Sequence, residues 1–142
     1  RTSLASALRA RALHLPPPRY RASRKSVDTA KTPQGHTLRA TLHLPEGQDG
    51  PFPTVLMRTP YGRRAEFGQT VFCEQGFAVV VQDTRGRFGS DGNFVPVQTE
   101  IEDGEATIRW IRKQPWYNGK LAVYGISYLG FTAWACAGGD EA

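Results

Sequence analysis

Several features that would assign this chain to a broad protein class are missing from its sequence. It has no stretch of about 20 consecutive apolar residues, so we expect no segment to span a membrane. It has only two cysteines, Cys73 and Cys136, which lie far apart and lack metal-ligand spacing. We therefore expect two buried thiols in a reduced compartment, and no metal site.

Recognisable nucleotide-binding signatures are also missing. Residues 85–92 read RGRFGSDG, but no Lys-Ser or Lys-Thr pair follows them. Their spacing fits neither a P-loop nor a dinucleotide-binding fingerprint. The sequence therefore predicts no bound cofactor. We expect Asp83, Arg85 and the following glycines to brace this loop through an internal ion pair and turn hydrogen bonds.

Acidic residues are missing from the first 25 positions. Those positions hold seven Arg or Lys and contribute +7, whereas the other 11 basic and 13 acidic residues contribute −2, for a net charge of +5. We therefore interpret residues 1–26 as a basic, disordered tail. A nucleic-acid-binding arm is the alternative, but it has no aromatic interleaving beyond Tyr20, so we expect no nucleic-acid partner. We expect a cytoplasmic protein, with organelle targeting by the Arg-rich N-terminus as the alternative.

The rest of the chain, residues 27–142, alternates strand and helix patterns. With 142 residues and 39% hydrophobic side chains, the chain suits one domain with a real core. The patterns predict strands at residues 36–44, 54–58, 77–82 and 121–124, a helix at 63–75, and a second helix that starts at 99. For that second helix we expect a Thr99–Glu102 capping box and a buried stripe of Ile101, Ile108 and Ile111. This alternation indicates an α/β fold with a parallel sheet.

The most informative segment is residues 119–131, GKLAVYGISYLGF, with Ser127 at its centre. A short apolar run ends at Gly125, the serine follows two residues later, and a helix-forming segment comes next. This order is typical of a nucleophile elbow, in which a sharp strand-to-helix turn exposes one hydroxyl. The common pattern is G-x-S-x-G, whereas here Leu129 takes the second glycine position and Gly130 follows it. On the residues alone, a plain turn and a catalytic serine both remain open.

Four blocks in order carry a family resemblance: RTPYG, GFAVVVQDTRGRFGSDGNF, QPWYNGK and GISYLGF. Together they resemble the CocE/NonD hydrolases, the family of cocaine esterase and the X-prolyl dipeptidyl-peptidases, over roughly residues 27–137. The resemblance implies the N-terminal portion of an α/β-hydrolase fold, with a mostly parallel sheet up to the nucleophile elbow and its helix. It also implies the elbow pattern G-x-S-Y-x-G, which this chain matches.

The resemblance assigns roles around the elbow. Ser127 would be the nucleophile of a serine hydrolase that cleaves small esters, amides or peptides through an acyl-enzyme, with X-Pro dipeptidyl-peptidase activity as the alternative. The backbone N–H of Tyr128 and the side-chain hydroxyl of Tyr61 would donate to the oxyanion. From the residues alone, Tyr61 could equally be a turn aromatic. We expect Trp134 to be buried on its helix rather than to line a substrate pocket.

No histidine follows Ser127 in the sequence, although α/β-hydrolases carry the triad in the order serine, acid, histidine. His14, His36 and His43 all precede it, and Asp140 and Glu141 follow it too closely to serve. We therefore expect residues 27–142 to be an incomplete catalytic domain whose triad acid and histidine lie beyond residue 142. As it stands, such a fragment is expected to be inactive. A non-catalytic fragment with a nucleic-acid-binding tail is the alternative, and the sequence leaves the oligomeric state open.

Overall fold

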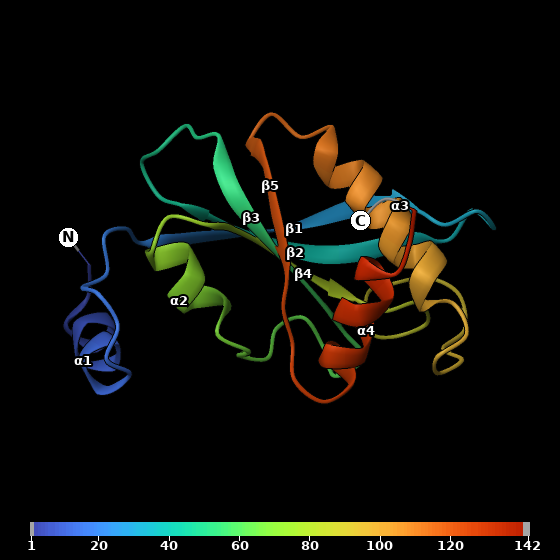
Figure 1. Ribbon diagram of the computed structural model, residues 1–142, viewed down its shortest axis with the longest axis horizontal. Helices are drawn as coiled ribbons and strands as arrows, with labels where there is room; N and C mark the ends of the chain where they lie inside the picture. The colour runs from blue at the N-terminus through green and yellow to red at the C-terminus, as the bar shows by residue number, and fades with distance from the viewer. Residues whose placement is uncertain (1, 141–142) are drawn as a thin grey trace.

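The described part of the chain folds into one five-stranded sheet with helices on both faces (Figure 1). The structure is a computed structural model that describes residues 2–140. Its elements in chain order are α1 (Leu4–Ala12), β1 (Ala22–Lys31), β2 (Thr37–Pro45), β3 (Phe52–Thr59), α2 (Gln69–Glu74), β4 (Ala78–Asp83), α3 (Glu100–Arg112), β5 (Tyr117–Val123) and α4 (Tyr128–Ala137).

The sheet is mixed, with strand order β1-β2-β4-β3-β5. Strand β3 pairs in parallel with β4 and β5, whereas β2 is antiparallel to both β1 and β4. The α/β class is confirmed, but the sheet is less parallel than the expected, mostly parallel one, because both pairings of β2 are antiparallel. The turn between β1 and β2 is closed by the Thr32 N–H donating to the His36 carbonyl, and a turn this short can only join antiparallel strands.

The first 26 residues contain more structure than the expected tail. Helix α1 is capped by Ser3, whose side chain accepts from the Ser6 N–H, and Arg9 pairs with Glu74 at 2.8 Å. Strand β1 was missed altogether because its sequence, ASRKSVDTAK, is mostly polar. As an edge strand it needs backbone pairing with β2 more than apolar side chains.

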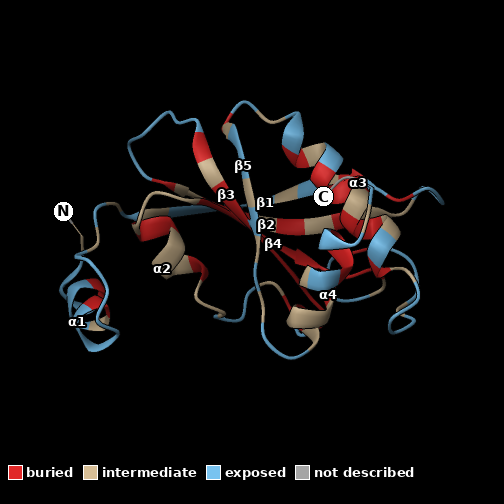
Figure 2. Ribbon diagram, viewed as in Figure 1, coloured by how far each residue is buried: buried red, intermediate tan, exposed pale blue. Residues whose placement is uncertain are grey.

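The core consists of two apolar clusters on opposite faces of the sheet, because side chains alternate along β3 and β4. One cluster packs beneath α3 and includes Leu56, Val80, Ile108 and Ile111, all nearly inaccessible to solvent. The other packs beneath α2 and includes Val55, Met57, Cys73, Val79, Val81 and Leu129. Figure 2 shows the buried residues concentrated in the middle of the sheet, with α1 and β5 largely exposed.

Two predicted helices differ in detail from the structure. Helix α2 begins at Gln69 rather than at residue 63, because Gly68 has φ 95° and interrupts a right-handed helix. Helix α3 starts as predicted, but Thr99 makes no side-chain cap. Glu102 pairs instead with Arg85 at 2.7 Å, so the capping box does not form.

Two apolar residues expected to be buried lie at the surface. Ile101 is 53% exposed, while Ile108 and Ile111 are buried as predicted. Trp134 is 80% exposed, because α4 turns Leu129, Thr132 and Cys136 toward the sheet and points Trp134 away from it.

The loop that follows β4 is held by ion pairs to other segments of the chain rather than by an ion pair within the loop. Asp83 forms an ion pair with Arg63, in the loop after β3, and also accepts the Gly89 N–H at 3.1 Å. Arg85 pairs with Asp103 of α3. The expected internal Asp83–Arg85 pair is therefore wrong, because each residue finds its partner on another segment. These pairs fix the loops at the carboxyl end of the parallel strands.

Candidate active site

Ser127 lies on the sharp turn between β5 and α4. Its backbone has φ 54° and ψ −131°, a conformation that is costly for a residue with a side chain and that recurs at functional sites. The turn is tight enough to require glycine before it. A Cβ atom added at Gly125 would lie 2.3 Å from the Leu129 Cβ, and one added at Gly130 would lie 3.3 Å from the Gly125 carbonyl oxygen. The Ser127 side chain is exposed at the carboxyl end of the sheet.

Tyr61 reaches the same place from the neighbouring strand. Because β3 and β5 are parallel, the segments that follow them emerge at one edge of the sheet. The Tyr61 N–H donates to the Thr59 side chain at 3.0 Å, which fixes the turn after β3. The Tyr61 hydroxyl and the Ser127 Oγ are 3.2 Å apart, and either can donate in this hydrogen bond. The structure therefore brings together two residues that are 66 positions apart in sequence.

Tyr128 is the first residue of α4, so its backbone N–H has no acceptor within its own helix. Its side chain has a role that the sequence did not indicate. The hydroxyl accepts the Val97 N–H at 3.0 Å and donates to Glu100 Oε1 at 2.9 Å. Burial, and then the Glu100 charge, raise the pKa of the Tyr128 phenol, so it remains protonated and able to donate.

A buried ionic cluster lies beneath this tyrosine. Arg58, at the end of β3, is 1% exposed and pairs with Glu100, which is 2% exposed, at 2.9 Å. Its Nε donates to the Gln82 side chain at 2.8 Å. Its backbone carbonyl accepts the Thr132 hydroxyl of α4, also at 2.8 Å. The helix that follows Ser127 is thus anchored to β3 directly and to α3 through Glu100.

Two of the histidines lie on or next to β2 rather than on the segments that form the elbow. His43 is buried on β2, and His36 lies in the turn before it, where a Cβ on Gly92 would touch its ring. Within residues 2–140, no histidine forms a hydrogen bond with Ser127. The Asp140 N–H donates to Glu105 Oε1 at 2.8 Å, and Glu141 lies outside the described residues.

Cys73 and Cys136 are both buried free thiols, on α2 and α4 respectively. Burial, with a smaller contribution from Glu74, raises the pKa of the Cys73 thiol to about 12. Among the residues that the structure describes, no three His, Cys, Asp or Glu side chains gather as a metal site would require. No helix in that part of the chain is long and apolar enough to cross a membrane.

Comparison with known proteins identifies the family of the chain. The family model described as X-Pro dipeptidyl-peptidase (S15 family) matches residues 34–142. Cocaine esterase from Rhodococcus sp. strain MB1 Bresler is 41% identical over 110 residues, which cover 72% of this chain and 19% of the esterase. The chain therefore spans about a fifth of the length of this relative.

Solved structures show the same fold. An α-amino acid ester hydrolase is 30% identical with a TM-score of 0.68, covering 82% of this chain and 23% of that protein. A CocE/NonD family hydrolase from Staphylococcus aureus is 25% identical with a TM-score of 0.73, covering 82% of this chain and 25% of that one. The match of the family model to most of the chain, together with these relatives, shows that the chain belongs to the X-Pro dipeptidyl-peptidase (S15) family of hydrolases, which includes the CocE/NonD relatives.

Proposed function

We propose that this chain carries the nucleophile and the oxyanion donors of a serine hydrolase that cleaves small esters or amides through an acyl-enzyme. The observation that carries the proposal is the 3.2 Å contact between the Tyr61 hydroxyl and the Ser127 Oγ at a strained strand-to-helix turn. A plain turn has no need of strain at a serine, nor of a tyrosine brought to it from another strand.

In the first step the Ser127 Oγ attacks the substrate carbonyl carbon and passes its proton to a general base. The carbonyl oxygen becomes negative, the leaving group takes up a proton and departs, and the acyl group remains on Ser127. Water then attacks the ester and releases the acid. A serine hydroxyl needs the base because it stays protonated near neutral pH.

Two donors are positioned for the oxyanion. In the resting site the Tyr61 hydroxyl can donate to the Ser127 Oγ, and a carbonyl oxygen held beside that atom lies within reach of the same hydroxyl. The Tyr128 N–H, at the start of α4, is the second donor and adds the favourable end of the helix dipole. A cavity of about 470 Å³ beside Tyr61, lined also by Phe88 and the loop at 62–65, offers room for part of a substrate.

The general base and its carboxylate are not found among the described residues that surround Ser127. We propose that sequence outside this chain supplies both, since the matched residues cover only 19% of the esterase relative. On this proposal, residues 1–142 alone do not turn over an ester.

The experiment is active-site labelling with a fluorophosphonate in the full-length protein. We expect rapid labelling at Ser127 and none after Ser127→Ala, with kcat for an aryl ester lowered by roughly 10⁴-fold or more. Ser23→Ala, at an exposed serine on β1, is the matched control and should label normally. Normal labelling and turnover of the Ser127→Ala variant would refute the proposal.

X-Pro dipeptidyl-peptidase activity is the second candidate, because the matching family model carries that description. A comparison of Xaa-Pro-p-nitroanilide with p-nitrophenyl acetate separates the two candidates. A peptidase should prefer the anilide by kcat/KM and should lose that preference when proline is replaced by alanine. An esterase should turn over the acetate and leave both anilides largely intact.

A further inference from the structure

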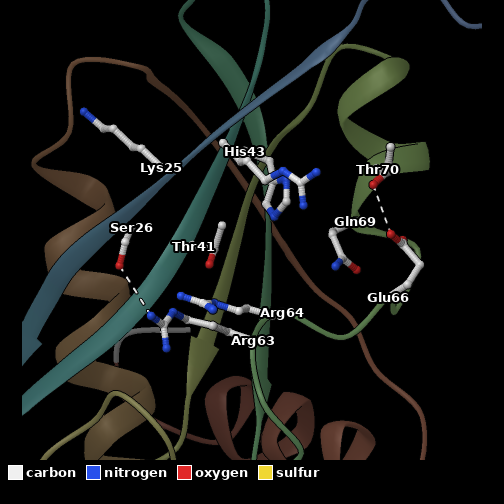
Figure 3. Close-up of a pocket in the computed structure, with 10 residues that line it drawn as sticks. Lys25, Ser26, Thr41, His43, Arg63, Arg64, Glu66, Gln69 and Thr70 are labelled. Atoms are coloured by element: carbon white, nitrogen blue, oxygen red, sulfur yellow. Dashed lines mark hydrogen bonds between the residues drawn. The ribbon is translucent and has the colours of Figure 1, made fainter. Parts of the chain in front are cut away.

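A second cavity lies on the α2 face of the sheet, between the β1–β2 edge and the loop that leads into α2 (Figure 3). Its volume is about 380 Å³, which is large enough to hold a small ion. Arg24, Arg63 and Arg64 line it together with the polar side chains of Thr41 and Gln69. Ser127, Tyr128 and Tyr61 are not part of its lining, so nothing in the proposed hydrolytic reaction explains it.

His43 lines this cavity and is itself buried. It is 5% exposed, and its Nε2 is buried without a hydrogen-bond partner among the described residues. Figure 3 shows the imidazole pointing into the space between Thr41 and Gln69. An unpaired buried polar nitrogen is costly, so its presence beside a cavity indicates a partner that occupies the cavity.

The charge around His43 is positive. Arg24 lies directly opposite His43 in the β1–β2 register. Burial is the main cause that lowers the pKa of the His43 imidazole, and the Arg24 charge is the second. His43 is therefore neutral near pH 7 and can present one N–H. Arg63 is paired with Asp83, but its Nε is also buried without an acceptor.

The lining of the cavity carries more cationic donors than anionic acceptors. Within residues 2–140, neither Arg24 nor Arg64 forms an ion pair with a carboxylate. Glu66 is the one acidic residue in the lining, and its oxygens accept from the Gly68 N–H at 3.0 Å and the Thr70 hydroxyl at 3.1 Å. The charge of Glu66 also reaches His43, where it opposes the effect of Arg24 on the pKa of the imidazole. The lining nevertheless holds four cationic side chains, one of them Lys25, against this one carboxylate, so the cavity carries an excess of cationic donors.

We propose that this cavity binds a small oxyanion of the phosphate type. Arg24 and Arg64 supply the positive charge, and the His43 Nε2–H donates a hydrogen bond from the buried side of the cavity. Guanidinium groups match the geometry of phosphate oxygens, and hydrogen bonds to a charged acceptor are the strong ones. A phosphate would satisfy the His43 nitrogen, which has no partner in the protein.

The test is calorimetric titration of the full-length protein with inorganic phosphate, in buffer with about 0.1 M chloride to screen diffuse attraction. Arg24→Gln with Arg64→Gln removes two exposed charges and should weaken phosphate binding by about 100-fold, roughly tenfold for each charged donor. His43→Leu should weaken it by about tenfold. Melting temperatures of the same samples verify that each variant is folded.

The matched control is Arg19→Gln with Lys31→Gln, which removes the same charge at exposed positions outside the lining. We expect it to change the phosphate Kd by less than about threefold. Absence of phosphate binding, or equal loss in the control and the Arg24/Arg64 variant, would overturn the proposal. Acetate is titrated in parallel, and tighter binding of acetate than of phosphate would overturn the choice of a phosphate-type ligand.

Discussion

Tyr61→Phe separates a catalytic hydroxyl from a packing aromatic. The substitution keeps the ring and deletes one oxygen, whose one hydrogen bond among the described residues is the 3.2 Å contact with the Ser127 Oγ. If that oxygen stabilises the oxyanion, the loss appears in the transition state and hardly at all in substrate binding. We therefore expect kcat to fall while KM stays nearly unchanged.

The magnitude follows from the kind of donor that is removed. Loss of one oxyanion donor in a hydrolase costs about 10²- to 10³-fold in kcat, which is about 2.7–4 kcal/mol. The effect on folding should be small, because Tyr61 is 50% exposed. Surface substitutions of this kind change the free energy of unfolding by about 0.5 kcal/mol or less.

The assay measures kcat, KM and the melting temperature on the same full-length preparation with an aryl ester. Tyr124→Phe is the matched control, since Tyr124 is also a partly exposed tyrosine near the elbow, at 40% exposure, and packs edge-on against Phe72. We expect this control to retain kcat within about twofold. A Tyr61→Phe enzyme with normal kcat, or with losses explained by a lower melting temperature, would refute the assignment of the hydroxyl.

Three further substitutions test the surroundings of the elbow. Tyr128→Phe leaves the Glu100 carboxylate without its hydroxyl donor and should lower the free energy of unfolding by about 1–3 kcal/mol, measured by urea denaturation. Gly125→Ala places a Cβ 2.3 Å from Leu129, so soluble expression and ester turnover should both fall sharply, and a normal enzyme would contradict the tight turn. Cys73 has a folded pKa of about 12 against an ordinary 9.0, so stability should fall as pH rises from about 9 toward 12. Cys73→Ala should flatten that part of the profile.

The strands that carry the site could be predicted because their residue types and their hydrophobic patterns both favour a strand. Val79, Val80 and Val81 form a β-branched run that suits a strand buried on both faces, and β4 is buried throughout. The elbow was located from its glycines and its serine, since the spacing of a tight turn is a local property. Local patterns succeed where one segment determines its own conformation.

What the sequence did not reveal depends on partners distant along the chain. The pairing of Arg58 with Glu100 joins residues 42 positions apart, and neither residue has a local signal for burial. Strand β1 is polar and needs β2 to be a strand at all. Trp134 was misplaced because α4 is apolar on almost every side, so its pattern does not say which face meets the sheet.

The same long-range contacts bear on how the strain at Ser127 is maintained. A non-glycine residue at φ 54° costs on the order of 1–3 kcal/mol and persists only where its surroundings over-determine it. Here Tyr128 is held through Glu100 on one side of the turn, and Thr132 is held on the Arg58 carbonyl one helical turn later. Only the Tyr128 contact ends on a charged group, the Glu100 carboxylate that Arg58 pairs with, so removal of either charge should loosen the start of α4 before it unfolds the sheet. The Thr132 contact uses the Arg58 backbone carbonyl and does not depend on the Arg58 side chain. The buried pair then acts as a positioning device for the serine, although a pair of this kind adds little net stability of its own.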